Sequence, residues 1–113
     1  MAKVIIVNSL EEEINNKFKG ESVEIFELIY SLEKNPKKGK PVGHVAGMVI
    51  KELKYKNFRF YFVADGYKIK FLDISELQNL LVKFVRMSDK KTQQKTIEEI
   101  KDILRKLGKE GFY

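Results

Sequence analysis

The feature that most constrains the fold is a stretch over residues 45–73 in which apolar and polar side chains alternate. Alternation with a period of two indicates β-strands, because successive side chains point to opposite faces of a sheet. The dipeptides Lys56-Asn57 and Asp65-Gly66 are typical of two-residue hairpin turns, and Asp-Gly is the stronger signal. We therefore predict strands over 45–55, 58–64 and 67–73, joined by two hairpins.

The turn at 56–57 also predicts which side chains face each other. It pairs Lys54 with Arg59 and Glu52 with Tyr61 across the first hairpin. Extended through the second turn, the pattern predicts an apolar core face made of Leu53, Tyr55, Phe58, Phe60, Phe62, Ile69 and Phe71. The opposite face would be exposed and polar, with Glu52, Lys54, Arg59, Tyr61, Lys68 and Lys70.

Helices are expected on both sides of this region along the chain. After a short strand at 4–7, apolar residues every four positions predict a helix from Asn8-Ser9 to about Lys19. A second helix is expected over 22–34, because Asn35-Pro36 cannot continue it.

A fourth strand is predicted over 80–87, followed by a C-terminal helix. Thr96 and Glu99 have the spacing of a capping box, and Gly108 stands where helices commonly end. The sequence thus predicts one α+β domain over residues 1–113, an antiparallel sheet with two N-terminal helices and one C-terminal helix.

The charge is distributed unevenly along the chain, whose formal net charge is +6. Residues 1–33 hold three lysines and seven glutamates, whereas residues 34–59 hold eight basic residues and one glutamate. Segregated positive charge attracts polyanions such as RNA, although a lysine-rich solvated surface has the same composition.

Composition also excludes several classes of site. The chain has no cysteine and one histidine, His44, so we predict no disulfide, no metal site and no cofactor. No segment approaches the roughly 20 apolar residues of a membrane-spanning helix, and the apolar run at 4–7 is short for a secretory signal. A cytoplasmic protein without a membrane partner is expected.

The polar sheet face holds the candidate functional residues. Lys54 directly opposite Arg59 is unfavourable for a fold, since like charges repel, but an anion bound between them would be stabilised. Tyr61 offers a ring on which a base could stack. The alternative is an ordinary solvated face. Further lysines expected to bind RNA are Lys51, Lys68, Lys70, Lys90 and Lys91.

Several short segments between residues 35 and 104 occur in an order that resembles the RelE/ParE toxin superfamily, particularly its HigB-like, phage-derived branch. These segments are Asn35-Pro36 with Gly39 and Gly43, Glu52-Leu53-Lys54, Phe58-Arg59-Phe60-Tyr61-Phe62, Phe84-Val85-Arg86, and Lys90-Lys91-Thr92-Gln93-Gln94-Lys95-Thr96. Two features depart from the pattern: the stretch over 72–80 is longer than usual, and Ile97 replaces the usual proline.

The resemblance implies a toxin that cuts mRNA on the translating ribosome and an antitoxin protein that blocks it. Carried over by position, the catalytic set is Lys54, Arg59, Tyr61 and Arg86. The face of Arg86 stays ambiguous, because it shares parity with the apolar Val82 and Phe84. Two alternatives remain open, namely a topoisomerase poison of the ParE branch and a non-catalytic RNA- or ribosome-binding module.

Overall fold

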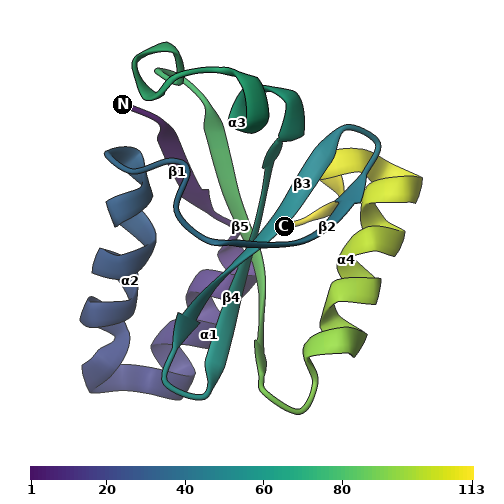
Figure 1. Cartoon of the computed structure of the whole chain (residues 1–113). Coiled ribbons are helices and arrows are strands. Elements are labelled where there is room, and N and C mark those ends of the chain that lie inside the picture. The colour runs from purple at the N-terminus through teal and green to yellow at the C-terminus, as the bar shows by residue number, and fades with distance from the viewer.

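Five strands in the order β1-β5-β4-β3-β2 form the central sheet of the computed structural model, which describes residues 1–113 (Figure 1). The strands are β1 (Lys3–Ile6), β2 (Lys40–Val45), β3 (Met48–Tyr55), β4 (Phe58–Asp65) and β5 (Leu81–Asp89). The pairs β2–β3, β3–β4 and β4–β5 are antiparallel, whereas β1 pairs with β5 in parallel.

Helices lie on both faces of the sheet. They are α1 (Asn8–Phe18), α2 (Ser22–Tyr30), α3 (Gly66–Phe71) and α4 (Gln93–Leu107), with short 3₁₀ turns at Lys19–Glu21, Ser31–Glu33, Ile74–Glu76 and Gly108–Gly111. The predicted α+β layout, with two N-terminal helices and one C-terminal helix, is therefore confirmed. No helix has the length and apolar character needed to cross a membrane.

One face, which we call the hairpin face, packs against α1 and α2. Phe18 of α1 meets Phe58 of β4 edge to face, with ring centroids 4.9 Å apart, and it also contacts Phe60. The other face, the α4 face, is crossed by α4, which contacts β2 and β5 (Figure 1). Because both faces carry a helix layer, side chains on either face of the central strands are buried.

The predicted register of the first hairpin is confirmed. Tyr55 pairs with Phe58 and Lys54 with Arg59, and the pairing continues to Met48 and Asp65. Residues Leu53, Phe60 and Phe62 are buried on the hairpin face, as expected.

The predicted strand over 67–73 is wrong, because this segment forms α3 and a turn. Asp65 does not open a hairpin; its carboxylate accepts a hydrogen bond from the backbone N–H of Lys68 at 3.0 Å and so caps α3. Phe71 consequently lies outside the core, 62% exposed, and Ile69 is only half-buried. Lys68 and Lys70 are on α3 and not on the sheet.

Two boundaries also differ from the prediction. A turn at Ala46 and Gly47, both with positive φ (51° and 81°), divides the predicted strand 45–55 and pairs β3 with β2. The last helix has its N-cap at Thr92 and not at the predicted Thr96, so it starts four residues earlier. The Asp89 carboxylate accepts backbone hydrogen bonds from Lys91 and Thr92 at 2.9 Å at this helix start. Gly108 ends it as predicted, with φ 68°.

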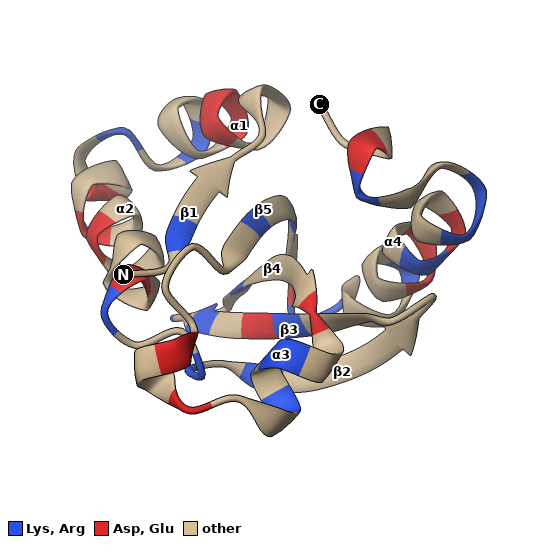
Figure 2. Cartoon of the chain, turned by 90° about the horizontal axis from the view of Figure 1, so that it is seen from above, with Lys and Arg blue, Asp and Glu red and all other residues tan.

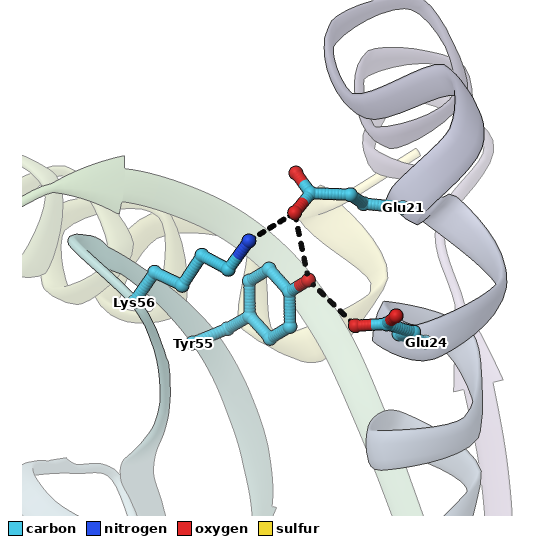
Figure 3. A network of polar contacts seen from close by, with 4 residues as sticks. All are labelled: Glu21, Glu24, Tyr55 and Lys56. Carbon is cyan, nitrogen blue, oxygen red and sulfur yellow. Dashed lines mark hydrogen bonds and ion pairs between the residues drawn. The ribbon is translucent and has the colours of Figure 1, made fainter.

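A polar network fastens the β3–β4 turn to the N-terminal helices (Figure 3). The Tyr55 hydroxyl donates to Glu24 at 3.0 Å and contacts Glu21 at 3.4 Å, and Lys56 forms an ion pair with the same Glu21 carboxylate. The hydrogen bond from Lys56 holds the pKa of Glu21 below its usual value, and the same contact raises the pKa of Lys56.

This network predicts a pH dependence of stability with two limbs. Because the folded pKa of Glu21 is depressed, its contribution is present above the unfolded pKa near 4.5 and is lost as the pH falls through the folded value. The contribution of Lys56 is present below its unfolded pKa near 10.5 and is lost as the pH rises through the raised folded value. Urea unfolding across pH is expected to show a shallower acid limb in Glu21→Gln than in the wild type. Identical acid limbs would contradict the assignment.

Candidate nucleic-acid interface

The four candidate catalytic residues lie on one face, on adjacent strands. On the α4 face, one cross-strand row contains Lys54, Arg59 and Ser88, and the neighbouring row contains Glu52, Tyr61 and Arg86. We call these six residues the polar lattice. Three strands thus bring together side chains that are up to 36 residues apart in the sequence.

The ambiguity over Arg86 is resolved by a β-bulge. Tyr61 pairs with Arg86 while Phe62 pairs with Phe84, so Val85 is an extra residue in β5. The bulge reverses the alternation, which leaves Phe84 on the hairpin face and turns Arg86 to the α4 face. Arg86 there donates to Glu99 of α4 at 2.7 Å and lies over the ring of Phe112, 5.2 Å from its centroid.

The predicted exposure of this face is wrong for its two central residues. Arg59 is 8% exposed and Tyr61 is fully buried, whereas Lys54 at the end of β3 is exposed. The physical reason is that α4 crosses this face, which the sequence prediction had left open to solvent. Burial raises the pKa of Tyr61, and its hydroxyl is engaged with Ser88 Oγ at 2.8 Å. The protein therefore holds Tyr61 neutral and fixed.

Arg59 has a buried acidic neighbour that the sequence prediction had not assigned a role. Its Nε lies 4.0 Å from Oε1 of Glu52, and both side chains are about nine-tenths buried. The Arg59 guanidinium also donates to the Phe58 carbonyl at 3.1 Å. The second carboxylate oxygen of Glu52, Oε2, is buried and has no hydrogen-bond partner. A buried carboxylate oxygen without a hydrogen-bond donor is uncommon in folded proteins.

This pair lines a hollow at the open edge of β3. Strand β2 begins opposite Glu52, so β3 has no neighbour on that side beyond this point. The hollow has a volume of about 400 Å³. It is bordered by the Glu52–Arg59 pair, by three exposed lysines and by three uncharged residues: Leu28, Lys38, Gly39, Lys40, Glu52, Leu53, Lys54 and Arg59. We call it the basic hollow, because four of its side chains are cationic and one is acidic.

Gly39 determines the shape of the basic hollow. Its φ of +105° is a conformation that residues with a Cβ rarely adopt. A Cβ at this position would lie 2.9 Å from the Phe62 ring and 3.2 Å from the Glu52 carbonyl oxygen. The glycine therefore allows the chain to turn against the sheet, with Lys38 and Lys40 on either side of it.

The additional lysines that the sequence predicts to bind RNA are dispersed. The prediction that Lys51 lies at the surface is wrong. Lys51 is 3% exposed on the hairpin face, and its Nζ donates to the Lys37 carbonyl at 2.7 Å. Burial and the charge of Lys37 lower the pKa of Lys51. Lys90 and Lys91 are exposed beside Asn57 at the far end of β5.

The charge segregation expected from the sequence is visible on the folded chain (Figure 2). Red segments mark α1 and α2, which carry Glu11, Glu12, Glu13, Glu24 and Glu27, and blue segments mark α3, whereas α4 shows both colours. The acidic charge is thus concentrated on the N-terminal helices, and α3 is basic. No group of three or more His, Asp or Glu side chains is arranged to bind a metal ion.

No family model, no curated protein and no solved structure matches this chain. The polar lattice and the basic hollow are therefore the features that indicate a function. Sequence reasoning missed Glu52 as a functional candidate and missed Lys38 and Lys40. The pairing of Glu52 with Tyr61 already put it on the same face as Arg59, and this was the signal that could have identified it.

Proposed function

We propose that this protein is an endoribonuclease that binds single-stranded RNA in the basic hollow. The observation that supports this is the Glu52–Arg59 ion pair, which lines the basic hollow together with Lys38, Lys40 and Lys54. Cations bind the phosphate backbone, and a carboxylate that lines the same hollow can accept a proton from the ribose. The two requirements of RNA cleavage, charge stabilisation and a base, meet at this one place.

The proposed reaction is an attack of the ribose 2′-oxygen on the adjacent phosphorus. Glu52 accepts the 2′-hydroxyl proton as the O2′–P bond forms. Arg59 and the hollow lysines stabilise the negative charge that accumulates on the phosphate oxygens. The P–O5′ bond then breaks, the 5′-oxygen takes a proton from Lys54 or water, and the product is a 2′,3′-cyclic phosphate. Tyr61 acts as a positioning residue, because its hydroxyl is held by Ser88.

The resemblance to the RelE/ParE superfamily supports a more specific proposal. The protein would be the toxin of a toxin–antitoxin pair, cutting mRNA on the ribosome in the cytoplasm until a cognate antitoxin blocks it. A second candidate is a non-catalytic RNA-binding module. It is favoured by the internal contacts of Arg59 and Tyr61, which are compatible with a purely structural role.

The test is a cleavage assay on translating ribosomes with purified wild-type protein and the Lys54→Ala and Lys106→Ala variants. Both lysines are exposed, but Lys106 is on α4, outside the hollow. The wild type and Lys106→Ala are expected to cut the mRNA, and Lys54→Ala to be at least about tenfold slower because one phosphate contact is lost. Growth arrest on expression should follow the same order. If the wild type binds RNA without cutting it, the enzyme proposal fails and the binding module replaces it.

A further inference from the structure

The geometry points to a base-stacking site at Tyr67 and Phe71 of α3, which would hold the same single-stranded RNA at a second place. The inference rests on the proposed function and extends it, because it assigns recognition of unpaired bases to a part of the surface remote from the basic hollow.

The two rings form an exposed aromatic pair that the fold does not use. Tyr67 is 67% exposed and Phe71 is 62% exposed, although both are large side chains. Their ring centroids are 4.9 Å apart with an interplanar angle of 44°. The neighbouring Ile69 and Leu72 make the contacts with the core instead. Exposed aromatic rings adjacent to cations are the arrangement on which single-stranded bases stack.

The cations beside the rings are free to bind phosphate. Lys70 Nζ lies 5.3 Å from the centroid of Phe71, and neither Lys68 nor Lys70 forms an ion pair. The carboxylates of the same segment cap helical turns: Asp65 accepts from the Lys68 N–H, and Glu76 accepts from the Asp73 N–H. The remaining carboxylate, Asp73, belongs to the same capping box.

A path along β2 leads from the basic hollow to α3, the helix that carries the aromatic pair. Lys40, the first residue of β2, lines the basic hollow. The next residue, Pro41, lines a second hollow of about 330 Å³ together with His44, Gly66, Ile69 and Lys70. At a rise of about 3.3 Å per residue, the six residues of β2 cover roughly 20 Å, a span for a few nucleotides. One RNA strand would therefore contact the lysines at one end and stack at the other.

The test measures the affinity of labelled single-stranded RNA, long enough to cover both places, for a Tyr67→Ala/Phe71→Ala variant. Because one stacked base contributes about tenfold or more to affinity, the double variant is expected to bind at least about tenfold more weakly. Tyr30→Ala is the matched control, since Tyr30 is an exposed tyrosine (41%) on the acidic helix α2. A Tyr67→Leu/Phe71→Leu variant, which retains apolar volume, should show the same loss.

An abasic RNA of equal length tests whether the rings contact bases. The wild type and the double variant should bind it equally, because it has no base to stack on the rings. If the wild type binds RNA and both double variants bind it as tightly, the stacking site is refuted while the proposed function stands. A change in sedimentation without a change in RNA affinity would also refute it, since the rings would then contact protein. If the wild type binds no RNA at all, the proposed function itself fails.

Discussion

Replacing Arg59 with alanine is expected to lower the free energy of unfolding by about 3–5 kcal/mol, one of the two largest effects anticipated in this protein. Glu52 and Arg59 are about nine-tenths buried and have their charged atoms 4.0 Å apart. Removing the guanidinium leaves the carboxylate buried without its countercharge and also removes the hydrogen bond to the Phe58 carbonyl. The measurement is urea unfolding at neutral pH.

Lys54→Ala is the matched control for this experiment. Lys54 is the cross-strand neighbour of Arg59 and has the same charge, but it is exposed. Its removal should change stability by no more than about 0.5 kcal/mol. Equal stability of the Arg59→Ala and Lys54→Ala proteins would show that the buried pair is not important for the fold. Cleavage assays on Arg59 variants must therefore be accompanied by a measurement of the folded fraction.

Glu52→Gln is expected to have the largest effect on chemistry, a fall in the cleavage rate of about 10²–10⁴-fold, which is the usual contribution of a general base. Glutamine keeps the shape of the side chain but cannot accept the 2′-hydroxyl proton. RNA affinity should be unchanged or higher, because one negative charge is removed from the basic hollow. The readout is single-turnover cleavage together with equilibrium binding and the folded fraction, because the substitution leaves the buried Arg59 guanidinium without its countercharge.

The control for Glu52→Gln is Glu27→Gln, which removes an exposed carboxylate on α2. This variant should cleave and bind as the wild type does. A Glu52→Gln protein that binds RNA and cleaves it at the wild-type rate would exclude Glu52 as the base. A parallel loss of binding and cleavage would instead indicate that the substitution disturbs the hollow.

The parts of the fold that could be predicted from the sequence are those determined by short-range geometry. A two-residue turn at Lys56-Asn57 leaves one register for the strands on either side, so the partners of Lys54 and Glu52 followed directly. The helix ends at Gly108 and near Asn35 were also predicted from residues next to them in the sequence.

The Asp65-Gly66 dipeptide shows where local reasoning failed. Aspartate before glycine favours a hairpin turn, but the same carboxylate can cap a helix, and only the surrounding packing decides between them. Here the Gly66 N–H donates to the Gly47 carbonyl at 2.9 Å, a contact from the β2–β3 turn that the prediction did not contain. Because the prediction lacked this contact, it placed a strand over 67–73 where the structure has α3.

The burial of Arg59 and Tyr61 could not be predicted, because it depends on long-range packing. The C-terminal helix was predicted, but nothing in the sequence assigned it to one face of the sheet. The bulge at Val85 was similarly invisible, since the pattern around Phe84 and Arg86 has no glycine or other bulge signal. The parallel pairing of β1 with β5 joins segments nearly 80 residues apart.

The most direct test of the central claim is a backbone NMR titration of the wild-type protein with a short single-stranded RNA. We expect the largest shift changes at the amides of Gly39, Lys40, Leu53 and Lys54, which border the basic hollow. These changes should shrink as salt is raised, with a log–log slope of affinity of roughly −0.7 per neutralised phosphate. Shift changes confined to α1 and α2, or none at all, would contradict the claim that RNA binds in the basic hollow.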